Sequence, residues 1–463
     1  MDHATIAAIA TPPGEGGIGV VRISGADAAS VASRIFRKSG RRPAIDLAST
    51  PSHRLIYGNI VDDRGTTIDE VLLAWMKGPH TYTREDTVEI SCHGGPLPLR
   101  ETLRLALAAG ARHAERGEFT LRAFLNGRLD LAQAESVLNV IGARTSESLR
   151  LAVDDLGGDL SRRLEPATSA LIPLLAYLDA SADFPDDEID LADIREGLDQ
   201  AETALASVVA GSNAGMLYRE GTQVALVGRP NVGKSSLLNA ILRSDRSIVT
   251  PIAGTTRDVI AETVNLRGIP TTLLDTAGIV DTEDPVEQIG VERSRKALAT
   301  AAAVAFIVDG SMSPSEGDLD IARTLASRPR DQQTPVVLIV NKRDLPQASQ
   351  DAITSALPGI EPVHVSATTG QGLDTLEEAL AKTLMADASG GAQPALVNAR
   401  QRSALERALV HLQDAQAGHD LGVPQDLLAT SVRAALHAIG EVTGENVDEA
   451  VLNEIFSSFC IGK

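Results

Sequence analysis

One short stretch, residues 228–236 with the sequence GRPNVGKSS, constrains the fold of this chain more than any other. It joins the strand-like run Gln223–Val227 to a helix-like run, so a glycine-rich turn connects a strand to a helix. In a phosphate-binding loop of this pattern, backbone N–H groups and the helix N-terminus form a cradle for anions. Lys234 adds a positive charge, and Ser235 adds a hydroxyl that can bind magnesium. The stretch predicts a nucleoside triphosphate site, with an ordinary strand-helix turn as the alternative reading.

The residues around this loop alternate between strand-like and helix-like runs. Such alternation predicts a mostly parallel sheet covered by helices, with ligands at the carboxyl ends of the strands. Asp275 opens the tetrapeptide DTAG directly after one run, as an acidic residue near phosphate-bound magnesium would. The predicted strands are Gln223–Val227, Thr263–Leu266, Thr271–Leu274, Ala303–Val308 and Pro335–Val340.

Two further motifs indicate which base the nucleotide carries. NKRD, at Asn341–Asp344, ends another apolar run, and its carboxylate can accept two parallel N–H bonds from guanine but not from adenine. Ser366 and Ala367 follow the strand-like run Pro362–Val365 and could supply a backbone N–H for the guanine carbonyl oxygen. The motifs together predict GTP rather than ATP.

The residue after the DTAG motif departs from the Ras-type pattern. There a glutamine orients the attacking water, but here Gly278 is followed by the apolar Ile279. Another group must therefore orient water and neutralise the transition-state charge. The candidates are acidic residues of the segment EDPVEQIG and an ion held near the phosphates.

Composition limits the class of protein. The 463 residues are enough for roughly three domains, and the net charge of −20 argues against a uniformly basic nucleic-acid binder. Cys92 and Cys460 are far apart and lack metal-ligand spacing, which favours a reducing, cytoplasmic compartment over a disulfide framework. The chain has neither a signal-like start nor 18 uninterrupted apolar residues, so we expect no export and no membrane span.

The first 110 residues predict an α+β domain, with strand-like runs and one helix-like run at Leu97–Ala109. Three polar residues, Arg22, Glu89 and His93, occur within or next to its strand-like runs. Each by itself is more typical of a structural residue than of a ligand contact. A helical period near residues 129–141 predicts an amphipathic helix, and more helices follow. Periodicity is lost after Ser207, which predicts a linker over residues 208–221.

The last residues end in Cys-Ile-Gly-Lys. Asn446 can cap a helix with an apolar face that includes Val451, Phe456 and Phe459. On spacing alone, Cys460 is as compatible with an inert buried thiol as with a working one.

These motifs occur together with GTTRD at Gly254–Asp258, the N-terminal block ATPPGEGGIGVVRISG and the final FSSFCIGK. In this combination the chain resembles the MnmE (TrmE) family of tRNA-modification GTPases over nearly its whole length. The resemblance implies a multidomain fold with an α+β folate-binding and dimerisation domain, an all-α helical domain and an inserted α/β P-loop GTPase domain. The implied segments are 1–118 (N-terminal), 119–215 (helical, first part), 216–385 (GTPase) and 386–463 (helical, second part).

The resemblance also implies the chemistry. Members are potassium-stimulated GTPases that form homodimers and act on tRNA with the flavoprotein MnmG (GidA). Together they install a 5-carboxymethylaminomethyl or aminomethyl-type group at the wobble uridine, with magnesium and a 5-formyl- or methylene-tetrahydrofolate as cofactors. A GTPase of ribosome assembly or a signalling switch without tRNA chemistry is the alternative.

Matching the motifs of the family to this sequence implies which residues form its sites. The implied catalytic residues are Glu287, Lys234 and Cys460. Potassium would be held by Asn231, Thr250, Ile252 and Thr255, and magnesium by Ser235 and Thr256. Folate would be bound by Arg22, Glu89, Arg128 and Lys463. GTP would be bound by Asn231, Val232, Gly233, Lys234, Ser235, Ser236, Thr250, Thr255, Thr256, Asp275, Thr276, Ala277, Gly278, Asn341, Lys342, Asp344, Ser366 and Ala367.

Three positions depart from the family pattern. Arg128 stands where some members have lysine, so the charge is kept while the geometry differs. Glu15 and Val280 stand where related sequences lead us to expect arginine.

Overall fold

The computed structural model describes residues 4–39, 45–183, 193–243, 261–275, 300–327, 334–389 and 392–463. The chain divides into two compact units, Met1–Leu138 with Gly440–Lys463, and Asn139–Ile439. The segment boundaries at residues 118, 215 and 385 stay a prediction. Among the helices in the described ranges, none combines the length and the apolar character needed to cross a membrane.

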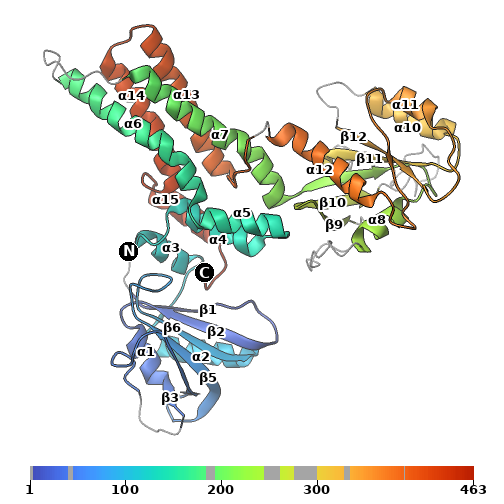
Figure 1. Ribbon diagram of the computed structural model, residues 1–463. Helices are drawn as coiled ribbons and strands as arrows, with labels where there is room; N and C mark the ends of the chain where they lie inside the picture. The colour runs from blue at the N-terminus through green and yellow to red at the C-terminus, as the bar shows by residue number, and fades with distance from the viewer. Residues whose placement is uncertain are drawn as a thin grey trace. The chain divides into compact units, whose positions relative to one another are not determined.

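The first unit is built on a seven-stranded sheet (Figure 1). Its strands pair antiparallel except β1 with β7, which are parallel. Alternate residues of β5, such as Leu73 and Trp75, are buried with residues of the helices α1 (Ala28–Ile35) and α2 (Pro96–Ala108), which confirms the α+β prediction. The strand order is β3 (Phe36–Lys38), β4 (Arg54–Val61), β5 (Thr67–Met76), β6 (Thr87–Gly94), β2 (Gly16–Ser24), β1 (Ile6–Ile9) and β7 (Arg112–His113).

The first unit also contains the helices α3 (Glu118–Leu125) and α15 (Glu449–Ser457) and the first part of α4 (Leu131–Gly142). The predicted helix near residues 129–141 corresponds to α4, and Gly127 with φ 69° lies in the turn between α3 and α4. The prediction that Asn446 caps the last helix is wrong, because α15 begins at Glu449 with Asp448 at its N-cap.

The helical part of the second unit contains long helices that lie side by side (Figure 1). The predicted linker at residues 208–221 is wrong, because residues up to Glu220 continue α7 as a helix. Its glycines made the segment look irregular, but they are close-approach sites: a Cβ on Gly215 would lie 1.9 Å from the carbonyl oxygen of Ala395. The helices are α5 (Ser146–Leu156), α6 (Asp159–Asp183), α7 (Ile194–Glu220), α13 (Ala399–Asp420) and α14 (Gln425–Thr443).

The rest of the second unit is a six-stranded sheet with helices on both faces. Alternate residues of β8 belong to two apolar clusters on opposite faces of the sheet. Val224 and Leu226 pack with α8 and α12. Ala225 and Val227 pack with α10 and α11. β9 is antiparallel and the other strands are parallel, as the alternating pattern predicted. The strand order is β13 (Val363–His364), β12 (Val336–Asn341), β11 (Ala303–Asp309), β8 (Thr222–Val227), β10 (Ile269–Asp275) and β9 (Ala261–Leu266). The helices are α8 (Lys234–Arg243), α10 (Glu316–Ala326), α11 (Asp351–Ala356) and α12 (Leu373–Ser389).

Candidate functional sites

The predicted phosphate loop lies between the end of β8 and the start of α8. Asn231 and Gly233 have positive φ angles of 67° and 99°, which let the loop turn sharply. A Cβ on Gly233 would lie 2.3 Å from the side-chain nitrogen of Asn341, so a side chain there would collide with the neighbouring motif. The strand, turn and helix expected for this motif are all present.

Lys234 lies close against this loop. The residue is only 9% exposed, and its ammonium donates hydrogen bonds to the carbonyls of Gly228 at 2.7 Å and Arg229 at 3.0 Å. Burial lowers the pKa of Lys234, and the nearby Asp275 carboxylate opposes that change. The amino group therefore lies at the loop where phosphate oxygens would bind.

Ser235 and Asp275 provide oxygen atoms beside the loop. The Ser235 hydroxyl donates to Asp275 Oδ2 at 3.2 Å, because β10 runs parallel to β8 and ends next to the loop. Asp275 Oδ1 is buried and has no hydrogen-bond partner among the described residues. Oxygen ligands suit magnesium, so this pair fits a magnesium ion bound together with phosphate.

The NKRD motif is tied both to the phosphate loop and to the Ser366–Ala367 turn. The buried Asn341 amide donates to the carbonyl oxygen of Val232 at 2.9 Å and accepts from the N–H of Ala367 at 3.1 Å. The Ser366 hydroxyl donates to Asp344 Oδ1 at 2.5 Å and so orients that exposed carboxylate. Three predicted motifs thus meet at the ends of β8, β12 and β13.

The amides predicted to meet the guanine carbonyl oxygen are used within the protein. The N–H of Ser366 donates to the Gln371 carbonyl at 2.8 Å, and that of Ala367 to Asn341. A base would have to share the Ala367 amide. Lys342 has φ 64°, and its ammonium pairs with Asp309 at 2.6 Å, which helps to hold the pKa of Asp309 below its usual range although burial opposes this.

Several predicted site residues lie outside the described residues, together with Ile279 and Val280, so their positions are not assigned. They are Thr250, Ile252, Thr255, Thr256, Thr276, Ala277, Gly278 and Glu287.

A second cluster of predicted site residues lies in the first unit. The Arg22 guanidinium pairs with Glu89 at 2.8 Å, as their facing positions on β2 and β6 require. It also lies 5.5 Å from the ring centre of Tyr82, and Arg128 lies 4.8 Å from the same ring. Two cations thus lie against the ring of Tyr82, which creates a site with charge and an apolar surface side by side.

The C-terminal tail joins this cluster. Arg22 donates to the carbonyl oxygen of Gly462 at 3.3 Å, and the N–H of Phe119 donates to the carbonyl of Lys463 at 3.2 Å. Gly462 has φ 93°, and a Cβ there would lie 2.4 Å from the carbonyl of Ile9. The Cys460 thiol is exposed. The four predicted folate residues therefore belong to one neighbourhood.

Sequence reasoning missed the aromatic members of this site, Tyr82 and Phe119. Tyr82 in the polar stretch TYTRED was the available signal, since aromatic residues make up only 3% of the chain. His93 is not placed with Arg22: its Nδ1 pairs with Asp69 at 2.5 Å, and this hydrogen bond raises the pKa of the largely exposed His93.

The sheet, the phosphate loop and the guanine-reading motif define a P-loop GTPase, a GTP-hydrolysing enzyme. Family models for the "GTP-binding protein TrmE N-terminus" and the "MnmE helical domain" match residues 5–128 and 131–460. The chain therefore belongs to the MnmE family of tRNA modification GTPases.

Named relatives agree with this assignment. The chain is 50% identical to the tRNA modification GTPase MnmE of Roseiflexus castenholzii, with 99% of each chain covered. It is 48% identical to the protein of the same name from Chloroflexus aurantiacus, again over 99% of both chains. The corresponding protein of Symbiobacterium thermophilum is 48% identical over 100% of each.

Proposed function

We propose that this chain is a potassium-stimulated GTPase that works with the flavoprotein MnmG to modify the wobble uridine of tRNA. The product would be a 5-carboxymethylaminomethyl or aminomethyl-type uridine. One observation carries the proposal. This member of the family has a guanine-nucleotide site and also a separate site at the C-terminal tail that is both cationic and aromatic.

For GTP hydrolysis, Lys234 would bind phosphate oxygens and Asp344 would select guanine. Magnesium, held by Ser235 and Thr256, would supply positive charge at the phosphates. The Asp275 oxygen that has no hydrogen-bond partner among the described residues lies beside Ser235 and would suit a bound magnesium ion. Glu287 would act on the attacking water in place of the glutamine that Ile279 replaces.

Potassium would bind Asn231 and the carbonyls of Thr250, Ile252 and Thr255. Asn231 has the positive φ that also suits a residue with a purely backbone role, so a side-chain role needs a functional test. We expect GTP turnover to be much faster in potassium than in sodium at equal ionic strength. Equal, Ras-slow rates in both salts would contradict the ion-activated mechanism.

Glu287→Ala separates catalysis from binding. It should lower turnover and leave GTP affinity nearly unchanged. A parallel loss of both would assign Glu287 a structural role instead. Glu316→Ala, on the exposed face of α10, is the matched control and should change neither quantity.

The tail site would bind a 5-formyl- or methylene-tetrahydrofolate. The paired Arg22 and Glu89 offer donors and acceptors for a pterin, and Tyr82 offers an aromatic face. Arg128 and Lys463 supply charge for the glutamate tail, and Cys460 an accessible thiol. Calorimetry with 5-formyl-tetrahydrofolate should give binding that Arg22→Ala abolishes and Arg34→Ala does not; the absence of heat with the unmodified chain would contradict this assignment.

A homodimer fits the exposed face of the first sheet. Leu55, Tyr57 and Leu72 lie on that face with 69%, 50% and 43% exposure, and Tyr57 is paired with Leu72 across β4 and β5. Apolar side chains grouped on a sheet face mark an interaction surface.

The role in tRNA modification has its own test. Deletion of the gene should remove the modified wobble uridine from tRNA in mass spectra, and unchanged tRNA would exclude the tRNA role.

A further inference from the structure

The side chain of Arg229 leaves the phosphate loop and reaches the first turn of α10. Its guanidinium donates a hydrogen bond to the Ser315 hydroxyl and lies 3.5 Å from Asp318 Oδ2. These partners are 86 and 89 residues away in the chain. The sequence motifs of the nucleotide site contain neither of them, so the contact adds α10 to the surroundings of that site.

Ser315 and Asp318 form the capping box of α10. The Ser315 N–H donates to Asp318 Oδ2 at 3.0 Å, and the Asp318 N–H donates to the Ser315 hydroxyl oxygen at 3.4 Å. The Ser315 hydroxyl also donates to Asp318 Oδ2 at 2.6 Å, which leaves its oxygen to accept from Arg229. Because the helix is capped by its own residues, the bond from Arg229 has a role other than starting the helix.

Burial of the Asp318 carboxylate makes its pairing with Arg229 important. The Asp318 side chain is 10% exposed, and its Oδ1 is buried with no hydrogen-bond partner among the described residues. Within those same residues, Arg229 is the one basic side chain that pairs with Asp318. A buried carboxylate that loses its cation keeps its desolvation cost, so the pair resists separation. The Arg229 side chain itself is 45% exposed, so water reaches the pair from that side.

The backbone of Arg229 holds Lys234. The Lys234 ammonium donates to the Arg229 carbonyl at 3.0 Å and to the Gly228 carbonyl at 2.7 Å. Arg229 thus binds α10 through its side chain and the phosphate-loop lysine through its backbone. A shift of this residue would move the acceptors that place the Lys234 amine.

Close packing surrounds the start of the phosphate loop. A Cβ on Gly317, in the first turn of α10, would lie 3.2 Å from Arg229 Cδ, so the arginine stem lies against the helix. A Cβ on Gly228 would lie 2.4 Å from the carbonyl oxygen of Ile307 in β11. The loop is therefore held against β11 at Gly228 and against α10 at Arg229.

We infer that Arg229 is a positioning residue for GTP hydrolysis. Its contact with the cap of α10 holds in place the two carbonyls that position the Lys234 amine at the phosphates. The inference rests on the proposed function, in which Lys234 binds phosphate oxygens. A cation that is held in place before the nucleotide arrives binds phosphate charge without a further ordering cost.

A double-mutant cycle on GTP affinity, measured by calorimetry in the full-length chain, tests this role. Arg229→Ala should lower the affinity at least about tenfold. Asp318→Asn keeps an oxygen that can accept the capping bonds but removes the charge, so it should lower the affinity by a similar factor. The double variant should lose little more than either single variant, because both changes break one contact. Arg229→Lys keeps a cation for Asp318 and should recover part of the affinity.

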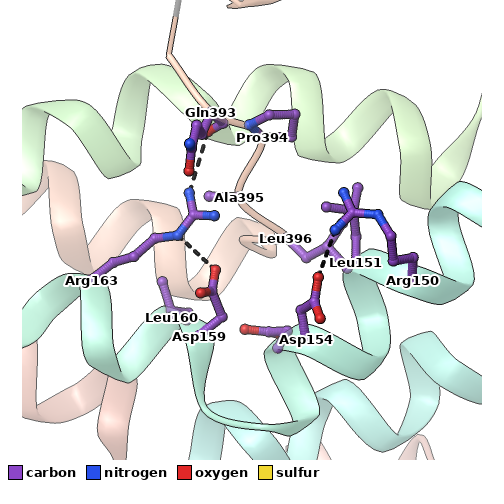
Figure 2. A pocket seen from close by; sticks show the side chains of 11 residues that line it. Arg150, Leu151, Asp154, Asp159, Leu160, Arg163, Gln393, Pro394, Ala395 and Leu396 are labelled. Atoms are coloured by element: carbon purple, nitrogen blue, oxygen red, sulfur yellow. Dashed lines mark hydrogen bonds and ion pairs between the residues drawn. The ribbon is translucent and has the colours of Figure 1, made fainter.

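Arg163→Ala is the matched control. Figure 2 shows this arginine in a hollow of about 400 Å³ that is lined by residues of α5, α6 and the segment 393–396. Its Nε donates to Asp159, the first residue of α6, at 2.6 Å. The variant breaks another arginine–aspartate pair at the start of a helix, in the helical part of the same unit. It should lower the thermal unfolding temperature by a similar amount and leave GTP affinity unchanged.

Two results would overturn the inference while the GTPase assignment stands. One is wild-type GTP affinity in Arg229→Ala, and the other is full additivity of the losses from Arg229→Ala and Asp318→Asn. Lys234→Ala tests the proposed function separately, and it should lower GTP affinity more than Arg229→Ala does. If Lys234→Ala binds GTP as the unmodified chain does, the proposed role of Lys234 fails and the inference falls with it.

Discussion

The side-chain nitrogen of Asn341 lies 2.9 Å from the carbonyl oxygen of Val232, 109 residues earlier in the chain. This bond joins the motif that reads the base to the loop that binds the phosphates. Asn341 is 2% exposed, so both groups are withdrawn from water. The two halves of the nucleotide site are therefore held in one arrangement by a single side chain.

Asn341→Ala should weaken both folding and nucleotide binding. The Val232 carbonyl and the Ala367 amide would lose their partner, at a cost of about 1–3 kcal/mol in the free energy of unfolding. We expect GTP affinity, measured by calorimetry, to fall at least about tenfold. Asn398→Ala is the control, because Asn398 caps α13 away from this site. It should lose stability and keep GTP affinity; equal GTP affinities in both variants would contradict the role of Asn341.

Asp344→Asn should change base selection. A carboxylate accepts two N–H bonds from guanine, while the amide that replaces it presents a donor that matches the second carbonyl of xanthine. GTP affinity should fall about a hundredfold, and affinity for xanthosine triphosphate should rise. Competition binding with the two nucleotides measures this. Asp351→Asn, an exposed change at the start of α11, should leave the preference for GTP intact.

Gly462→Ala should disturb the tail site. Its φ of 93° and the 2.4 Å approach of a Cβ to the Ile9 carbonyl leave no room for a side chain. The tail must shift away from Arg22, so we expect loss of folate binding and about 1–3 kcal/mol of stability. Gly422→Ala has a similar φ of 69° but nothing within 4 Å, and it should keep folate binding. Unchanged folate affinity in Gly462→Ala would show that the tail backbone does not form the site.

The two thiols should differ sharply in reactivity. Burial raises the pKa of Cys92 to about 11, while Cys460 is exposed. At pH 8 the native chain should take up one equivalent of iodoacetamide quickly, and Cys460→Ser should remove that fast phase. Since the folded state holds the Cys92 proton more tightly than the unfolded state, stability should fall as pH rises between about 9 and 11. Fast alkylation of Cys92 in the native chain, followed by mass spectrometry, would contradict this.

Much of the nucleotide site could be predicted from local sequence. The strand, loop and helix around Lys234 follow from apolar runs and glycine positions, which act over a few residues. The prediction failed where glycine had a tertiary role: Gly211 and Gly215 suggested a linker, yet they lie within α7 because residues 393–395 pack against them. The aromatic side chains beside Arg22 were missed for a related reason, since no local period marks them.

The sequence by itself determined the order of the motifs, the preference for guanine through Asp344 and the lack of a water-orienting glutamine at Ile279. These properties depend on residue type and on neighbours along the chain. Only the tertiary structure decided that Asn341 bonds to Val232, that Arg22 meets the tail at Gly462, and that Thr145 holds the hairpin turn at Gly268. These contacts join residues that are 109, 440 and 123 positions apart in the chain, separations over which sequence periodicity carries no information.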